Sequence, residues 1–163
     1  MSAISEEEYL RTSYDGVDRE FRDGEILERG EPTFHHGHMQ GASAAFFYSL
    51  RRSKHLYPAI STRVRLRPGR YVVPDVSVFW PIEPTTAIPE HLPLIVIEIL
   101  SPDERMMDVI GKLTEYQSHG IPHIWLLDPV HNTFYTFAGR LKPVQSAYIP
   151  EAGIEFQIAD LDP

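Results

Sequence analysis

The chain contains no cysteine among its 163 residues. Disulfide frameworks and thiolate zinc sites are therefore excluded, and a reducing compartment is the natural setting for such a chain. Long apolar runs are also missing, because runs such as residues 94–97 are far below the roughly 20 residues of a membrane span. The acidic start MSAISEEEYL lacks the basic and apolar stretches of a signal peptide. We therefore expect a cytoplasmic protein with no membrane partner.

Basic residues are in short supply, with 15 Lys and Arg against 23 Asp and Glu and a net charge of −8. This balance argues against strong non-specific binding of nucleic acid, which depends on neutralising phosphates. The charges are nevertheless unevenly placed, since no acidic residue lies between Glu31 and Asp75. The length and the 42% apolar content predict one domain, residues 1–163, with a core of its own.

Hydrophobic periodicity predicts a mixed sheet flanked by helices, which is an α/β (α+β) fold class. A capping box at Ser5 and Glu8 begins a short helix, and Asp23-Gly24 forms the turn of a hairpin. Residues 82–93 are rich in proline and predict a surface loop. The other expected elements are helices at 37–54 and 101–120 and strands at 59–67, 71–80, 92–100, 123–128, 133–139 and 141–149.

Two of these strands carry a carboxylate among apolar neighbours, Asp75 in YVVPDVSVFW and Glu98 in LPLIVIEIL. An ionised carboxylate in a dry core is costly unless it finds a partner. On adjacent strands the two acids converge on one point, where oxygen ligands suit a hard cation such as Mg²⁺. The alternative is that Asp75 lies at a strand edge and Glu98 pairs with an arginine.

A lysine borders the apolar stripe of the helix that follows Glu98. Lys112 lies between Val109 and Tyr116 at helical spacing, so it can approach the two carboxylates. There its amine would position a water molecule that attacks a phosphoryl group, and it would neutralise the negative charge that develops on that group. The alternative is an ordinary (i, i+4) pair with Asp108.

These residues, and others along most of the chain, resemble the PD-(D/E)xK nuclease superfamily and, within it, the restriction-endonuclease family often called Uma-two. "PD" alone is a weak signal, but "PD" followed by VIEILS, KLxxY and GIPxxWLLDP in this order is specific. The likeness runs from about Glu7 to Pro129. It is carried by EEYL at 7–10, DREFRDGEILER at 18–29, HGHMQG at 36–41, YVVPDVSVF at 71–79, LIVIEILSPDER at 94–105, GKLTEY at 111–116 and GIPHIWLLDP at 120–129.

The resemblance implies a restriction-endonuclease-like core with a Mg²⁺-dependent site, in which Mn²⁺ can substitute. Asp75 and Glu98 correspond to the metal ligands of the superfamily. The superfamily's lysine falls on Leu100 here, and Lys112 looks like its replacement. Glu25 resembles an acidic residue that reaches the metal directly or through water. His36 also fits the family pattern, and the resemblance implies DNA as substrate and a homodimer.

Arg63, Arg65 and Arg67 alternate with apolar residues and share one face of a strand. Such a stripe is suited to nucleic-acid binding through the phosphate backbone, whereas the alternative is a solvated face whose arginines pair with acids elsewhere. A second cluster, His35, His36 and His38, either binds zinc or nickel or only hydrogen-bonds at a helix start.

Three functions remain open from the sequence. The first is an endonuclease that hydrolyses DNA through Asp75, Glu98, Lys112 and Glu25. The second is a nuclease-like module that binds nucleic acid or a protein without turnover, which Leu100 and the acidic balance favour. The third is hydrolysis of a small phosphoester, for which the arginine stripe is irrelevant.

Overall fold

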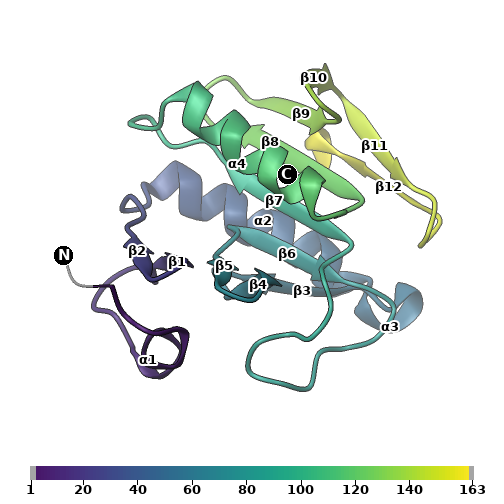
Figure 1. Cartoon of the computed structure of the whole chain (residues 1–163). Coiled ribbons are helices and arrows are strands. Elements are labelled where there is room, and N and C mark those ends of the chain that lie inside the picture. Colours follow the sequence, from purple (N-terminus) through teal and green to yellow (C-terminus); the bar gives the residue numbers. More distant parts are fainter. Residues whose placement is uncertain (1–2, 162–163) are drawn as a thin grey trace.

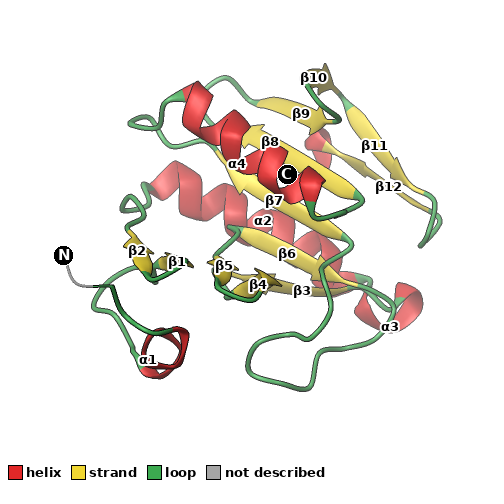
Figure 2. Cartoon of the chain, in the orientation of Figure 1, coloured by secondary structure: helices red, strands yellow, loops and turns green. Residues whose placement is uncertain are grey.

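A six-stranded sheet forms the centre of the molecule in the computed structural model, which describes residues 3–161 (Figures 1 and 2). Its strand order is β10-β9-β8-β7-β6-β3, and only β7 and β8 are parallel. The predicted mixed sheet is thus confirmed. The strands are β3 (Tyr57–Ile60), β6 (Val76–Phe79), β7 (Ile95–Ile99), β8 (His123–Asp128), β9 (Thr133–Phe137) and β10 (Leu141–Val144).

One long helix covers each face of this sheet. The parallel pair β7 and β8 needs a crossover connection, and helix α4 (Met106–Ser118) provides it. Val109, Leu113 and Tyr116 of α4 are buried against one face. Helix α2 (Phe34–Ser49) packs on the other face, and a short helix α3 (Arg51–Lys54) follows it. The alternation of side chains along β7 therefore divides them between two apolar clusters.

A second, smaller sheet lies beside the first, with strand order β2-β1-β5-β4 (Figure 1). Helix α1 (Glu6–Arg11) precedes it, and the Ser5 side chain caps this helix by accepting from the Glu8 N–H, as predicted. The predicted hairpin turn is confirmed at Asp23-Gly24, where both residues have positive φ. The strands are β1 (Glu20–Arg22), β2 (Glu25–Leu27), β4 (Val64–Arg67) and β5 (Arg70–Val72).

The C-terminal part packs against the α2 side of the central sheet. It consists of the hairpin β11 (Ser146–Ile149) and β12 (Ile154–Gln157), followed by the 3₁₀ helix η1 (Ile158–Leu161). Both outer strands of the central sheet contain a proline, Pro58 in β3 and Pro143 in β10.

Three predicted strands are interrupted in the structure. Residues 141–149 divide at Gln145 into β10 of the central sheet and β11 of the C-terminal hairpin. Residues 59–67 do not form one strand, because the chain leaves the central sheet at Ser61, where φ is 46°. Residues 71–80 divide in the same way, into β5 of the small sheet and β6 of the central sheet. Asp75 therefore lies in the short passage between the two sheets rather than in the middle of a strand.

The helix expected from Ser101 begins later, at Met106. The capping pair does form, but it closes a turn instead of starting the helix. The Ser101 N–H donates to the Glu104 carboxylate at 2.9 Å, and the Glu104 N–H donates to the Ser101 carbonyl at 3.1 Å. The Glu104 half of the predicted capping box is present, but the Glu104 N–H bonds to the Ser101 carbonyl rather than to its side chain, and the predicted helix start was wrong.

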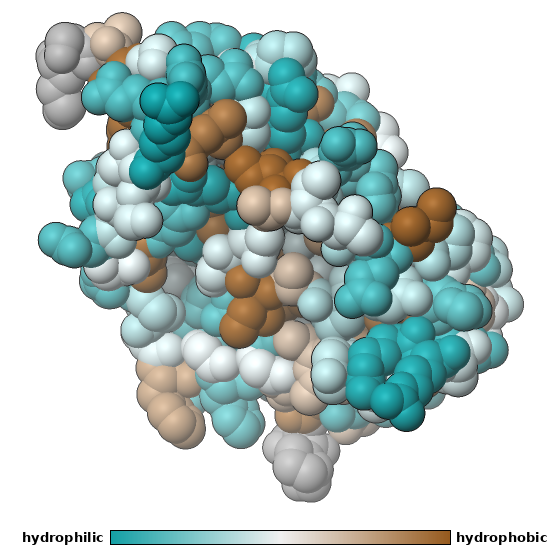
Figure 3. Space-filling model, turned by 90° about the horizontal axis from the view of Figure 1, so that it is seen from below, coloured by the Kyte–Doolittle hydropathy of each residue, from teal (hydrophilic) through white to brown (hydrophobic). Residues whose placement is uncertain are grey.

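The surface seen from the α1 side is largely hydrophilic. Figure 3 shows apolar residues there in small, separate groups among polar ones. None of the helices in residues 3–161 combines the length and the apolar character that crossing a bilayer requires.

We expect Phe156→Ala to lower the free energy of unfolding by about 3–5 kcal/mol. The Phe156 ring lies 5.0 Å from Trp125, 5.3 Å from Phe134 and 5.7 Å from Phe47 between centroids, so its removal leaves a cavity among aromatic rings. Chemical denaturation measures the change. Tyr148→Ala in the paired strand β11 is the control, because this ring is exposed and its loss should cost less than about 1 kcal/mol. Equal losses in the two variants would contradict the packing described.

Candidate active site

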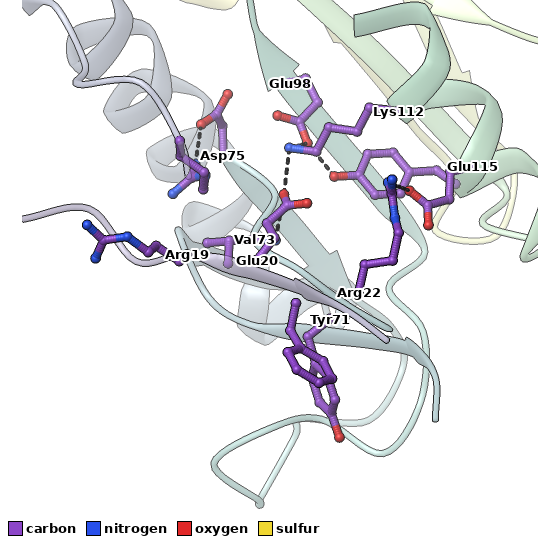
Figure 4. Close-up of polar contacts among 12 residues, drawn as sticks. Arg19, Glu20, Arg22, Tyr71, Val73, Asp75, Glu98, Lys112 and Glu115 are labelled. Atoms are coloured by element: carbon purple, nitrogen blue, oxygen red, sulfur yellow. Dashed lines mark hydrogen bonds and ion pairs between the residues drawn. The ribbon is translucent and has the colours of Figure 1, made fainter. Parts of the chain in front are cut away.

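Asp75 and Glu98 come together through the register of β6 and β7. Val76 pairs with Ile97 in this antiparallel ladder, so one further step places Asp75 opposite Glu98. Residues opposite each other project from the same face of a sheet. Both side chains are buried and line a cleft of about 900 Å³. Figure 4 shows them with Lys112 and Glu20 around one point.

The Asp75 carboxylate is held by three donors. Its Oδ2 accepts the Ile99 N–H at 2.8 Å and lies 3.2 Å from His36 Nε2, and its Oδ1 lies 3.1 Å from Arg29 Nη2. Gln40 Nε2 donates to the Asp75 carbonyl at 2.8 Å and fixes the backbone. Burial alone would raise the pKa of Asp75, but the hydrogen bond and charge of His36 hold it below its ordinary value.

The environment of Glu98 has the opposite effect. Its Oε1 accepts a hydrogen bond from the Tyr116 hydroxyl and lies 3.0 Å from Lys112 Nζ. Burial raises the pKa of Glu98 to about 7, and the nearby charge of Asp75 adds to the rise although Lys112 opposes it. Two neighbouring carboxylates thus differ in how readily they hold a negative charge.

A third buried carboxylate, Glu20 of β1, completes the cluster. Its Oε1 lies 3.0 Å from Lys112 Nζ and accepts the Val73 N–H at 3.2 Å. Burial would raise the pKa of Glu20, but the charges of Lys112 and Arg70 lower it. The Lys112 ammonium therefore lies between two carboxylates, one from each sheet. The expected alternative, a pair with Asp108, does not account for these contacts.

Glu25, the acidic residue expected early in the chain, lies apart from the cluster, whereas Glu20 of the same hairpin lies within it. Glu25 is exposed and does not line the cleft. Along the hairpin, Glu20 pairs with Leu27 whereas Glu25 pairs with Arg22 beside the turn, so Glu25 lies two pairs farther out. The alternation of side chains along the hairpin could not distinguish Glu20 from Glu25, since both glutamates project from the same face.

A buried arginine, Arg70, pairs with Glu20 and holds it in place. Arg70 Nη2 lies 3.1 Å from Glu20, and its Nε and Nη2 donate to Glu115 of α4 at 2.6 and 2.8 Å. Its Nη1 donates to the Tyr71 carbonyl at 2.8 Å and to the Phe21 carbonyl at 3.3 Å. The guanidinium is thus fully engaged, and it ties the small sheet to α4.

The predicted arginine stripe has other partners. Arg63 forms a bidentate pair with Asp18 at 2.7 and 2.8 Å, and Arg67 forms one with Asp23 at 2.7 and 2.8 Å. Arg65 lies 3.9 Å from Glu6. The lining of the cleft includes none of the three arginines. The structure therefore favours the alternative, in which the stripe pairs with acids from the N-terminal segment and holds that segment to the small sheet.

The three histidines do not converge on a common point. His36 is buried against Asp75, whereas His35 and His38 are exposed and pack on the Phe34 ring at 5.8 and 5.7 Å between centroids. Of the three histidines, His36 lies beside the cluster, where it contacts Asp75.

The donor set of the cleft fits a hard cation. Within residues 3–161, no three His, Asp or Glu side chains are close enough to form a complete metal cage. Mg²⁺ does not need one, because it keeps several waters and takes one or two carboxylates. Asp75 and Glu98 supply such a pair in the buried part of the cleft. The lining also contains more acidic side chains than lysines and arginines.

The family model named Uma2, with the description "Putative restriction endonuclease", matches residues 6–152. The chain belongs to the Uma2 family. No curated protein matches it. Among solved structures, the Uma2 chain is similar to a protein from Anabaena variabilis ATCC 29413, described as "a putative nuclease belonging to DUF820". The two are 24% identical over 97% of each chain, with a TM-score of 0.79.

That structural similarity shows a shared fold, which is restriction-endonuclease-like. Membership of Uma2 supports a nuclease-like function for the chain. The family was correctly identified from the sequence, because its motifs lie in the expected order along the matched region.

We expect Arg70→Met to destabilise the protein by about 3–5 kcal/mol, because it leaves Glu20 buried without its guanidinium. Arg22→Met is the matched control. Arg22 lies 3.6 Å from the same Glu115 but is half exposed, so its loss should cost less than about 1 kcal/mol. Urea denaturation of both variants checks the difference, and a small loss for Arg70→Met would contradict a structural role for the pair.

The stability of the wild type should fall relative to Glu98→Gln as the pH rises. Because the pKa of Glu98 is raised from 4.5 to about 7 in the folded state, its stabilising contribution is complete below pH 4.5 and is lost through pH 7. The difference in unfolding free energy should change by up to about 3 kcal/mol. Denaturation of both proteins from about pH 5 to pH 8 without divalent cations measures it. Parallel stability curves would show that Glu98 is ionised throughout.

Proposed function

We propose that this Uma2 protein is a Mg²⁺-dependent endonuclease that hydrolyses DNA phosphodiester bonds in the cleft. The observation that carries the proposal is the convergence of Asp75 and Glu98, from neighbouring strands, beside the Lys112 amine. Buried acids of this kind cost stability, so their concentration in one cleft is typical of a functional site. The family description supports the same reaction class.

Asp75 and Glu98 would hold the Mg²⁺ ion, with Mn²⁺ as a substitute. Bound there, the cation would lower the pKa of a water molecule and offset the negative charge of the phosphoryl group. The protein fixes both ligands firmly. The Ile99 N–H and His36 orient Asp75, and the Tyr116 hydroxyl orients Glu98.

Lys112 supplies positive charge beside the reacting phosphate. In this protein the amine comes from α4, the helix that follows β7. It does not come from the second residue after Glu98, where Leu100 packs against the apolar core. Glu20 holds the ammonium from the opposite side at 3.0 Å, so its position is fixed before substrate binds. A preorganised charge of this kind stabilises negative charge that develops in the transition state.

We expect Asp75→Asn and Glu98→Gln each to reduce DNA cleavage by roughly a hundredfold or more, because each removes a charged ligand of the catalytic cation. Nicking of supercoiled plasmid in Mg²⁺ and in Mn²⁺ measures activity, and calorimetry measures binding of Mg²⁺ itself. Glu25→Gln is the matched control, since it removes a carboxylate outside the cleft and should leave both measurements unchanged.

Cleavage that survives in either variant would reject the mechanism. DNA binding by the wild type without product in Mg²⁺ or Mn²⁺ would instead support the nuclease-like binding module. Cleavage of a small phosphodiester but of no DNA would favour the third function.

A further inference from the structure

Arg29 lies in the segment between β2 and α2 and forms part of the cleft wall. Its Nη2 is 3.1 Å from Oδ1 of Asp75, and only 15% of its side chain is exposed. The other Asp75 oxygen, Oδ2, is taken by the Ile99 N–H and His36. Arg29 therefore occupies the oxygen of Asp75 that the rest of the structure leaves available for a cation.

The positively charged groups at the two candidate ligands differ in how firmly they are held. Lys112 lies between Glu98 and Glu20, at 3.0 Å from each. Arg29 makes one ion pair, from a segment outside the helices and strands. Of these two groups, Arg29 loses less by leaving its carboxylate.

We propose that Arg29 binds the substrate phosphate, and that it is kept on Asp75 until a divalent cation replaces it there. This inference rests on the proposed function. A guanidinium and a metal ion both neutralise the charge on Oδ1, so they compete for it. Once displaced, Arg29 remains in the cleft wall with a planar pair of donors, which suits bidentate binding of a phosphate.

The charge of the cleft favours a further positive partner for the phosphate, in addition to the exposed Arg22 and Arg105 of its lining. Acidic side chains dominate its lining, and a phosphodiester that enters meets repulsion. The arginine stripe cannot relieve this repulsion, because Arg63 and Arg67 are held by Asp18 and Asp23 outside the cleft. Arg70 is also fully engaged by carboxylates and carbonyls. An arginine that becomes available only when metal binds gives the phosphate a partner at the moment it is required.

Two measurements on Arg29→Met test the exchange. Calorimetry with Mg²⁺ alone, without DNA, should show roughly tenfold tighter binding than in the wild type, because the competing guanidinium is gone. Fluorescence anisotropy with a labelled DNA duplex should show roughly tenfold weaker binding than in the wild type when Ca²⁺, a hard cation with oxygen ligands, is present. Gels check that the DNA is not cleaved under these conditions. In EDTA the same variant should bind DNA as the wild type does, since Arg29 is then on Asp75.

Arg29→Lys is the conservative variant, and it should recover part of the DNA affinity in Ca²⁺ because it restores a positive charge. Arg140→Met is the charge-matched control. Arg140 is exposed in the turn between β9 and β10, so its loss should change neither measurement. Urea denaturation of each variant separates these effects from a loss of folding.

Opposite changes in the affinities for Mg²⁺ and for DNA are the result expected, and a purely structural arginine would not give them. Weaker Mg²⁺ binding by Arg29→Met, or a loss of DNA affinity that is equal in EDTA and Ca²⁺, would overturn the exchange. If the wild type binds Mg²⁺ and cleaves DNA while Arg29→Met matches it in both affinities, only this inference fails. If the wild type binds no Mg²⁺ and cuts no DNA, the proposed function fails with it.

Discussion

One partly buried lysine, Lys112, organises the cleft. Lys112 lies 3.0 Å from a carboxylate on either side, Glu98 in the central sheet and Glu20 in the small sheet. Without this amine, two desolvated negative charges would face each other in a poorly solvated space, which is among the costliest arrangements in a folded protein. The positive charge of Lys112 also helps to lower the pKa of Asp75. The packing of α4 against the sheet therefore brings the positive charge that the buried acids need.

The two sheets meet at the cluster of Lys112, Glu98 and Glu20. The chain passes from β5 to β6 through residues 73–75, so the Val73 N–H that binds Glu20 and the Asp75 carboxylate come from the same short passage. Arg70 reinforces the junction by joining Glu20 to Glu115. These polar contacts add to the apolar packing of Val64, Leu66 and Val72 against α4 and the central sheet, and together they hold the small sheet at the edge of the cleft.

Much of the fold could be predicted from the sequence, because local patterns determine it. The Asp23-Gly24 turn, the Ser5 cap and the apolar runs around Glu98 each identify an element without knowledge of its neighbours. The convergence of Asp75, Glu98 and Lys112 could be predicted as well, since adjacent strands and the helix between them bring these positions together. The breaks at Ser61 and at residues 73–75 could not, because alternation continues through them and only tertiary contacts decide which sheet each half joins. The same limit explains Glu20 and Arg29, whose roles depend on how a hairpin and a loop fold over the sheet.

The prolines of the outer strands have a consequence for how the molecule meets its neighbours. A free strand edge offers a row of amide hydrogens on which another chain can extend the sheet. Pro58 in β3 and Pro143 in β10 each remove one donor from that row, and both strands are only four residues long. Both edges of the central sheet are therefore poor templates for a further strand, which disfavours edge-to-edge association of two molecules through this sheet.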